Sequence, residues 1–488
     1  MQHVANQTIG YAQPDRLPEW DGLATRIKPL SGLDALFLYL ESGGTPMHVA
    51  SVIRVIPPKR VRQFAEVLRQ HLMARLEPLP VVRRVLEEPP MALGHPVWRQ
   101  CEAVDLGKHI RIRKLPRAGS EKQLASLIGR LHAQPMSRER PLWEIIIIDG
   151  LADGSVALYM KSHHALVDGQ AGMQLTQAIL DIEPKPAQIP SGQTSTGKAQ
   201  PSKPNDLAKA ALRAAADQFG HILRGVPDGW RQLQGGLGEG SVWKRLRDSV
   251  WLAPRTPFNV TIGDKRRWAF TSLSLSQVKR VAKNFEASLN DVVMALVADA
   301  LRGYLIRRRL LPDDALIAAM PVSLRSEGQE GGNEVSMVQC PLATDLDSPV
   351  ERLRAIVAAT REIKGRVNAF RGLIPTDFPG VAAPIWVSGL SQLWKRGKLS
   401  ERLPALANLV VSNVPGPRVP LYIAGGVISH FHPVSIVTHG LGLNITLLSY
   451  QDSLEFGIVS APESMPKPEL ICDGLHAALA RLMQECET

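Results

Sequence analysis

A polar segment in the middle of the chain most constrains its fold. Residues 184–205, PKPAQIPSGQTSTGKAQPSKPN, are rich in Pro, Ser, Thr and Lys and hold almost no large apolar side chains. Such a segment cannot bury enough apolar surface to offset the entropy lost on ordering, so we expect an exposed linker. Because 488 residues are too many for one ordinary core, the linker predicts two globular halves.

A basic segment follows the linker, from Asp206 to about Pro254. It carries Trp230, Trp243 and Trp251 among arginines and lysines. Two interpretations stay open. The segment is either a helical region that lies on a membrane surface, with tryptophans at the interface and cations near anionic headgroups, or a solvated connecting helix whose tryptophans pack on the domains.

Composition narrows the class of protein. The hydrophobic share of 44% and the charged share of 21% are those of a globular chain, and the net charge of +11 suits acidic ligands or anionic surfaces. The four cysteines are scattered without a C-x-x-C, which fits a reducing cytosol. The sequence has no run of about 18 apolar residues, so we expect no membrane-spanning helix. With no nucleic-acid motif and 5% aromatic residues, we expect no nucleic-acid partner.

Each half mixes helices and strands, so the predicted class is mixed α/β. Apolar residues at helical spacing predict helices, and alternation or short apolar runs predict strands. The expected helices cover 35–41, 121–136 and 289–308. The expected strands cover 48–56, 143–150, 155–163, 315–324 and 405–414, and a hairpin over 444–459 turns near Asp452.

The stretch SHHALVDGQAG, residues 162–172, places two adjacent histidines ahead of an Asp-Gly pair. Neighbouring residues of a strand point to opposite faces, so His163 and His164 cannot both face one cavity if the strand continues to its end. No H-E-x-x-H set accompanies them, and we expect no metal. One histidine is expected to pack or hydrogen-bond structurally while the other faces a pocket.

The residues after the pair are expected to hold a strand-to-helix turn. Asp168, which with Gly169 forms a common turn pair, could cap the next helix or pair with an arginine. A neutral imidazole held in such a turn can accept a proton near physiological pH, because its unperturbed pKa is about 6.5. The alternative, a structural histidine near a strand end, stays open.

H-H-x-x-x-D-G is the signature of acyltransferases that resemble chloramphenicol acetyltransferase, a group that includes peptide-synthetase condensation domains. Other segments look like the bacterial wax ester synthase/diacylglycerol acyltransferase family, in collinear order from about Leu33 to Val459. They are PMHVASV (46–52), RPLWE (140–144), TPFNVTIGDKRRWAF (256–270), LNDVV (289–293), MPVSLR (320–325) and SNVPGP (412–417). The residues before Leu33 and the 184–205 segment depart from the family pattern.

This resemblance implies two chloramphenicol-acetyltransferase-like domains, each a mixed sheet flanked by helices, with the active site in a tunnel at their interface. We therefore divide the chain into four parts. They are an N-terminal extension (1–30), an N-terminal domain with the histidine motif (31–183), the linker with its basic Trp-containing helical connector (184–255) and a C-terminal domain (256–488).

The resemblance also implies residue roles in the histidine motif. In this family the second histidine, here His164, is the general base that deprotonates an acceptor hydroxyl as it attacks the acyl-CoA carbonyl directly. His163 is secondary, because strand alternation turns it away. Asp168 is structural and Gly169 supports it, with Arg325 as a candidate partner or a plain surface arginine.

Two further motifs carry expectations of the same kind. Asn290 resembles the family's second motif and either stabilises negative charge on the attacked carbonyl or caps the helix that Asn290-Asp291 opens, with Asp291 in support. The segment Pro141-Leu142-Trp143 is expected to be a rigid turn with a packing anchor, although it could line an acyl or alcohol channel.

The implied reaction moves a long-chain acyl group from acyl-CoA, a co-substrate, to diacylglycerol, a long-chain alcohol or both, with no cofactor. Since these lipids are amphipathic or insoluble, we expect a cytoplasmic protein peripherally associated with the inner face of the membrane or with lipid droplets. Two other functions stay open: a carrier-protein-dependent condensation enzyme, and a non-catalytic lipid-binding protein on the same fold. The absence of a G-x-S-x-G elbow excludes a serine hydrolase of that type. The motifs do not report acceptor preference, acyl chain length or oligomeric state.

Overall fold

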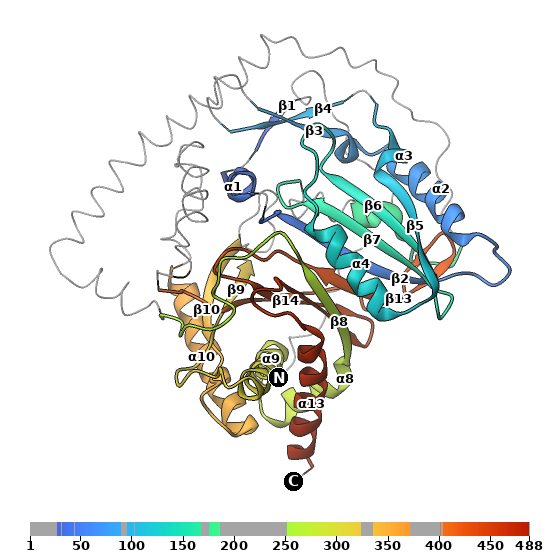
Figure 1. Cartoon of the computed structure of the whole chain (residues 1–488). Helices are drawn as coiled ribbons and strands as arrows, with labels where there is room; N and C mark the ends of the chain where they lie inside the picture. Colours follow the sequence, from blue (N-terminus) through green and yellow to red (C-terminus); the bar gives the residue numbers. More distant parts are fainter. Residues whose placement is uncertain are drawn as a thin grey trace.

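The computed structural model contains two six-stranded mixed sheets that face each other (Figure 1). It describes residues 27–30, 32–42, 44–88, 95–101, 103–166, 175–185, 251–323, 335–370, 401 and 404–487. The expected linker at 184–205 therefore lies outside the described residues apart from its first two positions, as does the basic segment up to residue 250. The two sheets and their flanking helices confirm the predicted fold class and the arrangement of two domains.

The first sheet has the strand order β12-β13-β2-β7-β6-β5. All its neighbours are antiparallel except β5 and β6. Helices α1, α2 and α3 accompany it, and α4 packs between β5 and strand β8 of the second sheet. The bounds are β2 His48–Ile56, β5 Ile110–Gly119, β6 Trp143–Leu151, β7 Val156–His163, β12 Tyr422–Ile423, β13 Gly426–Val434, α1 Gly32–Leu40, α2 Phe64–Leu76, α3 Leu106–His109 and α4 Glu121–Ala133.

A small three-stranded sheet lies beside the first half, in the order β1-β4-β3. Its strands are β1 Ile27–Pro29, β3 Arg84–Glu87 and β4 Val97–Gln100, and the 3-10 helix η2 spans Pro80–Arg83. Val82 of this helix is buried and its carbonyl accepts a hydrogen bond from the Trp143 indole at 3.0 Å. The small sheet is thereby anchored to the start of β6.

The second sheet has the order β10-β9-β11-β14-β15-β8, with β11 parallel to both of its neighbours. Four helices cover one face of it (Figure 1). The bounds are β8 Arg267–Ser274, β9 Ile317–Ser323, β10 Val335–Pro341, β11 Leu409–Val414, β14 Leu443–Tyr450, β15 Ser453–Ser460, α8 Leu275–Asn284, α9 Leu289–Arg307, α10 Pro349–Phe370 and α13 Glu469–Glu485.

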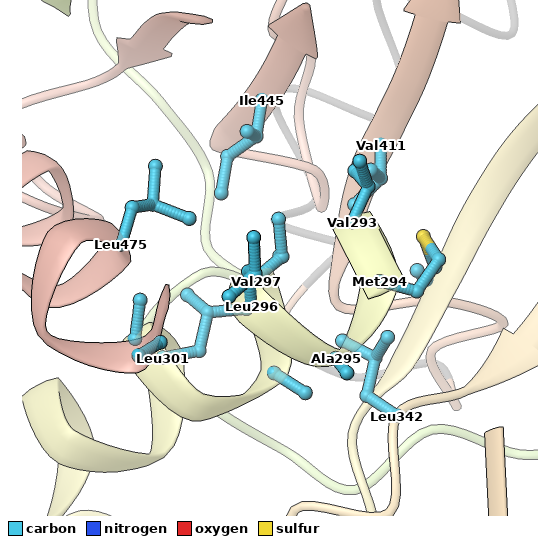
Figure 2. Close-up of a cluster of buried hydrophobic side chains, with 14 of the residues drawn as sticks. Val293, Met294, Ala295, Leu296, Val297, Leu301, Leu342, Val411, Ile445 and Leu475 are labelled. Atoms are coloured by element: carbon cyan, nitrogen blue, oxygen red, sulfur yellow. The ribbon is translucent and has the colours of Figure 1, made fainter. Parts of the chain in front are cut away.

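Helix α9 lies at the centre of the second half. It is buried along most of its length because α8, α10 and α13 pack around it. Its side chains meet Leu475 of α13 and the inward faces of β11 and β14 (Figure 2). Fully burying an apolar side chain such as Val or Leu contributes about 1.5–3 kcal/mol relative to leaving it exposed. Because α9 buries many such side chains, it is held firmly in place, and the residues of its first turn have fixed positions.

Strand β13 belongs to the second half of the sequence but completes the first sheet. It pairs with β2 over Val427–Val434 and also packs on β15 and β14 of the second sheet. The crossing is tight at Gly457, where an added Cβ would lie 1.7 Å from the carbonyl oxygen of Pro433. That oxygen accepts a hydrogen bond from the Trp268 indole at 3.2 Å. Only glycine lets the backbones approach this closely.

The predicted helices and strands are confirmed, with ends that differ by a few residues. The expected hairpin consists of β14 and β15, whose turn includes Asp452. The sequence reading did not identify α2, α8, α10 or α13, nor the exchange of β13 into the first sheet. Within the part of the chain that the structure describes, no helix is long and apolar enough to cross a membrane.

Candidate active site

The two histidines of the motif are fixed by backbone hydrogen bonds at the end of β7. The amide of His163 donates to the carbonyl of Leu142 at 2.9 Å, and the amide of His164 donates to the carbonyl of Met47 at 2.9 Å. Both acceptors lie in segments that the sequence singled out, RPLWE and PMHVASV. These motifs therefore hold the main chain of the histidine pair, and the side chains diverge from there.

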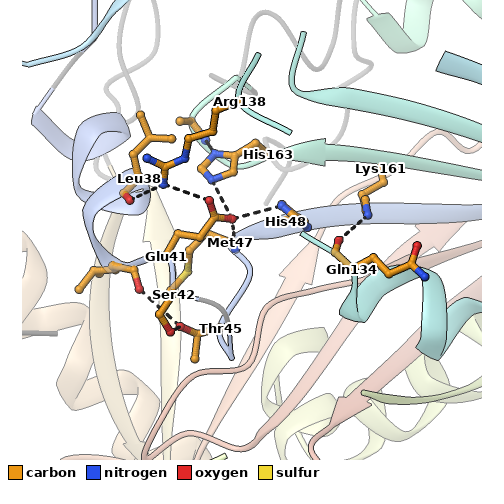
Figure 3. Close-up of polar contacts among 12 residues, drawn as sticks. Leu38, Glu41, Ser42, Thr45, Met47, His48, Gln134, Arg138, Lys161 and His163 are labelled. Atoms are coloured by element: carbon orange, nitrogen blue, oxygen red, sulfur yellow. Dashed lines mark hydrogen bonds and ion pairs between the residues drawn. The ribbon is translucent and has the colours of Figure 1, made fainter. Parts of the chain in front are cut away.

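The ring of His163 lies in a buried polar cluster with Glu41 and His48 (Figure 3). Glu41 Oε1 is 3.5 Å from His163 Nε2 and 3.2 Å from His48 Nε2. The same oxygen accepts the backbone N–H of Met47 at 3.2 Å, and Oε2 pairs with Arg138 at 3.1 Å. Glu41 thus connects α1 to the ends of β2 and β7.

The hydrogen bond at Nδ1 of His163 determines which nitrogen of a neutral ring carries the proton. The backbone N–H of Ala165 donates to His163 Nδ1 at 3.1 Å, so Nδ1 is an acceptor and the proton of a neutral ring lies on Nε2, facing Glu41. A metal on Nε2 would require an imidazolate anion, because Nδ1 already holds a lone pair against the amide. The three residues satisfy the spacing of a metal site, but the amide that donates to His163 Nδ1 leaves this ring no neutral form in which Nε2 also binds an ion.

Charge in this cluster is concentrated on Glu41. Burial alone would raise the pKa of this carboxyl, but hydrogen bonds from His163 and His48 lower it well below its ordinary value. Burial lowers the pKa of His48 to about 4 despite the neighbouring carboxylate. The arrangement is therefore an anionic Glu41 beside a neutral His48, as expected where burial disfavours additional charge.

His164 points away from that cluster, as strand alternation predicted for one member of the pair. Its ring stacks on Phe37 of α1 with centroids 3.8 Å apart and planes 20° apart. Its Nδ1 is buried and has no hydrogen-bond partner among the described residues. A neutral imidazole has one nitrogen that donates and one that accepts, so a neutral His164 always offers one lone pair.

The protonation state of His164 follows from its surroundings. Burial, and after it the adjacent His163, lower the pKa of His164 to about 4. The imidazole is therefore neutral at physiological pH and able to accept a proton. Stacking on Phe37 holds the plane of the ring against α1.

Asn290 and Asp291 occupy the first turn of α9 and have different environments. The N-cap of this helix is Ser288, whose hydroxyl accepts the N–H of Asp291, while the Asp291 carboxylate accepts the N–H of Ser288 at 2.8 Å. Asp291 also accepts a hydrogen bond from Thr360 at 2.7 Å. Asn290 takes no part in the cap, so that interpretation of it is wrong. Its amide contacts the sulfur of Met320 at 4.0 Å.

Pro141, Leu142 and Trp143 are all buried at the start of β6. The Leu142 carbonyl holds His163, the Trp143 amide bonds the Pro141 carbonyl at 2.9 Å, and the Trp143 ring packs on His109 with centroids 4.5 Å apart. These contacts make the segment a packed support for the histidine turn. Asp168, Gly169 and Arg325 lie outside the described residues, and their roles stay predictions.

Sequence reasoning did not find the partners of His163. Glu41 directly follows the last residue of α1, and His48 is opposite His163 in the register of β2 and β7. A second buried pair lies next to them, in which Lys161 Nζ is 2.7 Å from Glu144 Oε1 and donates to the carbonyls of Leu131 and Gln134. The alternating strands 48–56 and 155–163 could have suggested the neighbours only if their pairing register had been known.

The fold of the chain is shared with solved structures of low sequence identity. The first condensation domain of the calcium-dependent antibiotic synthetase covers 94% of this chain and 97% of its own length, at 14% identity and a TM-score of 0.52. At that identity the likeness shows the fold alone. It agrees with the pair of mixed sheets.

Closer relatives define the family. Residues 30–293 match the wax ester synthase/diacylglycerol acyltransferase catalytic domain, and residues 331–483 match the WS/DGAT C-terminal domain. The chain belongs to this family of acyltransferases. A Mycobacterium tuberculosis protein named as a diacylglycerol O-acyltransferase is 36% identical over 93% of this chain and 99% of its own. The structure of a wax ester synthase/diacylglycerol acyltransferase from Marinobacter aquaeolei VT8 is 30% identical, covers 94% and 100% of the two chains and has a TM-score of 0.69.

Proposed function

We propose that the protein transfers a long-chain acyl group from acyl-CoA to the hydroxyl of diacylglycerol, with His164 as the general base. The family and the activity named for the relatives support the reaction class and the acceptor. The observation that carries the role of His164 is its neutral ring, which stacks on Phe37 and whose pKa burial and the adjacent His163 lower to about 4. The tautomer that serves as a base here has its proton on Nδ1 and a lone pair on Nε2.

The reaction follows from that tautomer. Nε2 of His164 removes the proton of the acceptor hydroxyl while its oxygen attacks the thioester carbonyl, forming a tetrahedral oxyanion. Collapse of this intermediate breaks the carbon–sulfur bond, and the departing thiolate takes the proton back from the imidazolium. The products are an ester and free coenzyme A, and the histidine is regenerated without a covalent enzyme intermediate.

Asn290 is proposed as the donor that stabilises the oxyanion. Its amide is half-buried and is not used by the helix cap, and among the described residues it contacts the sulfur of Met320 at 4.0 Å, a weak partner. An amide donor placed where negative charge develops lowers the barrier by about 2.7–4 kcal/mol in comparable sites. Asn290→Ala should therefore lower kcat by about 100- to 1,000-fold, and an unchanged kcat would remove this role.

The proposal includes where the enzyme works. Acyl-CoA is a co-substrate and no cofactor is needed, because every proton in the scheme moves through His164. We propose a tunnel between the two sheets as the place where donor and acceptor meet. We also propose cytoplasmic action at a membrane or lipid-droplet surface, since the acceptor is insoluble in water. The net charge of +11 supports attraction to anionic surfaces and to coenzyme A phosphates.

The experiment is an acyl-transfer assay on the full chain with palmitoyl-CoA and, separately, dioleoylglycerol or hexadecanol. Thiol release and lipid products are followed for the wild type, for His164→Ala and for a matched control, His476→Ala, a solvent-exposed histidine on α13. Triacylglycerol formation that is lost in H164A and retained in H476A is the expected result. Activity retained by a folded H164A would remove the base.

Other outcomes of the same assay separate the alternatives. Wax ester without triacylglycerol would replace diacylglycerol by the long-chain alcohol as the acceptor. Turnover with carrier-tethered acyl donors but not with acyl-CoA would indicate a condensation enzyme. Lipid binding without turnover under every condition would indicate a non-catalytic protein.

A further inference from the structure

Two histidines of β13 face a buried glutamate of the other sheet. Side chains two residues apart on a strand share a face, and the rings of His430 and His432 are accordingly stacked, with centroids 5.6 Å apart and planes 11° apart. Opposite them, Glu455 of β15 is fully buried. The cluster therefore lies where β13 crosses the second sheet, two residues along β15 from Gly457.

The spacing of these groups is that of ligands around one ion. His430 Nδ1 is 3.4 Å from Glu455 Oε1, and His432 Nδ1 is 3.1 Å from Glu455 Oε2. One ligand atom from each of the three residues lies within 4.8 Å of the others. Tetrahedral ligands with bonds of about 2.0–2.1 Å are separated by about 3.3 Å. The observed distances bracket that value.

Hydrogen bonding alone leaves the cluster unsatisfied. His432 is buried, and its Nδ1 has no hydrogen-bond partner among the described residues although a carboxylate oxygen is 3.1 Å away. A cation between Nδ1 and that oxygen would give the buried nitrogen a partner and would balance the charge of the buried carboxylate.

We propose that His430, His432 and Glu455 bind one divalent transition-metal ion, and that Zn²⁺ fits best. Two imidazole nitrogens and one carboxylate oxygen are a known three-ligand set for zinc, which then takes water as a fourth ligand. The half-exposed side chain of His430 opens the site to solvent for the ion and that water. Ser272, which donates to Glu455 Oε2 at 2.7 Å, and the Phe456 backbone orient the ligands.

The ion would join the two sheets rather than take part in acyl transfer. His432 is opposite Val52 of β2, whereas His48 of the Glu41 cluster is four residues further along that strand, about 13 Å away at about 3.3 Å per residue. The ligands come from one strand of each sheet. Metal binding therefore stabilises the contact between the two halves of the molecule.

The sequence expectation of no metal rested on the adjacent pair His163–His164 and did not consider His430-x-His432. The Glu41 cluster is the natural competitor for an ion, but the N–H of Ala165 occupies the second nitrogen of His163 there. In the β13 cluster, His430 Nδ1 and His432 Nδ1 both face the carboxylate. We therefore expect the β13 cluster to bind a metal ion and the Glu41 cluster to bind none.

The test uses the full chain, stripped with a chelator and desalted. Zn²⁺ is titrated in competition with a chromophoric chelator, bound metal is counted by mass spectrometry after gel filtration, and Co²⁺ reports tetrahedral coordination through its visible absorption. The wild type should bind one equivalent, with an intense Co²⁺ band and a melting temperature raised by about 2 °C or more. His430→Ala and Glu455→Gln should each weaken Zn²⁺ binding by at least about 100-fold, beyond the effect of losing an outer-shell group.

Two further variants make the result decisive. His48→Asn removes the competing cluster and should retain one equivalent of Zn²⁺, as should the surface variant His476→Ala. Glu455→Gln keeps the shape of the side chain and its hydroxyl partner, so it tests the site even if His430→Ala is poorly folded. Failure of the wild type to retain zinc, binding unchanged in H430A and E455Q, or loss of the ion in H48N would each overturn the proposal.

Discussion

The tight crossing of β13 over β15 predicts a large cost for the smallest possible substitution. Gly457→Ala would place a Cβ 1.7 Å from the carbonyl oxygen of Pro433, whereas nonbonded carbon and oxygen rarely approach below 3.0 Å. The oxygen cannot retreat freely, because Pro433 is paired with Ser51 of β2 and accepts the indole N–H of Trp268. The sheets must therefore separate by more than an ångström.

The magnitude follows from two contributions. Overpacking costs about 1–3 kcal/mol and more where backbone must move, and losing the Trp268 hydrogen bond adds about 1 kcal/mol. We expect Gly457→Ala to lower the free energy of unfolding by at least about 3 kcal/mol. The matched control is Gly303→Ala in α9, where a Cβ meets no atom within 4 Å, and alanine should stabilise the helix by about 0.8–1 kcal/mol.

The assay is urea unfolding of both variants and the wild type, followed by tryptophan fluorescence and by circular dichroism. The same chemical change, addition of one methyl group, should shift the midpoint down at residue 457 and up at residue 303. If the free energy of unfolding of Gly457→Ala lies within about 0.5 kcal/mol of the wild-type value, the effect of an ordinary surface substitution, the close approach of the sheets described above does not exist in solution.

Two other predictions concern buried charge. Stability should fall on acidification, because histidines of the unfolded chain take up protons near pH 6.5, whereas His48 and His164 of the folded chain do so only near pH 4. Burial lowers the pKa of His132 as well. We expect a loss of at least about 1.4 kcal/mol per pH unit between pH 6.5 and pH 4, measured by urea unfolding at pH 7, 6 and 5, and a flat dependence would contradict the neutral state of these three histidines. Asp299→Ala should cost about 3–5 kcal/mol, because it leaves the buried guanidinium of Arg352 without the carboxylate 2.6 Å away. Arg481→Ala, which removes the half-exposed partner of the same carboxylate, should cost less than about 1 kcal/mol, and equal costs for the two variants would refute this reading.

The fold class and the local elements could be predicted because they are written in short-range periodicity. Alternation gave β2 and β7, and a long apolar repeat gave α9. The pairing of β13 with β2 could not be predicted in this way, because it joins positions almost 400 residues apart. Alternation within a strand indicates that it is a strand, but not which other strand it pairs with. Alternation also gave the essential property of the site, that His163 and His164 diverge.

The remaining features of the site depend on contacts that sequence alone does not specify. Glu41 is one carboxylate at the end of a short helix, and only the tertiary structure places it between two histidines. Capping of α9 is one of the two roles that the sequence allows for Asn290, because an amide is a common capping group, but Ser288 two residues earlier forms the reciprocal pair with Asp291. Several polar residues near a helix start compete for the cap, and the sequence pattern alone does not decide between them.

The pairing of β13 with β2 also determines the order in which the first sheet can form during synthesis. During synthesis β2, β7, β6 and β5 are made early, but the partner of β2 on its other side arrives only with residues 426–434. Until then β2 is a bare edge with unpaired amides and carbonyls, the kind of surface that recruits other strands. The first half can therefore gather its core early but cannot close its sheet until nearly the whole chain has left the ribosome. A fragment that ends before β13 would carry this open edge permanently, and aggregation would be its natural fate.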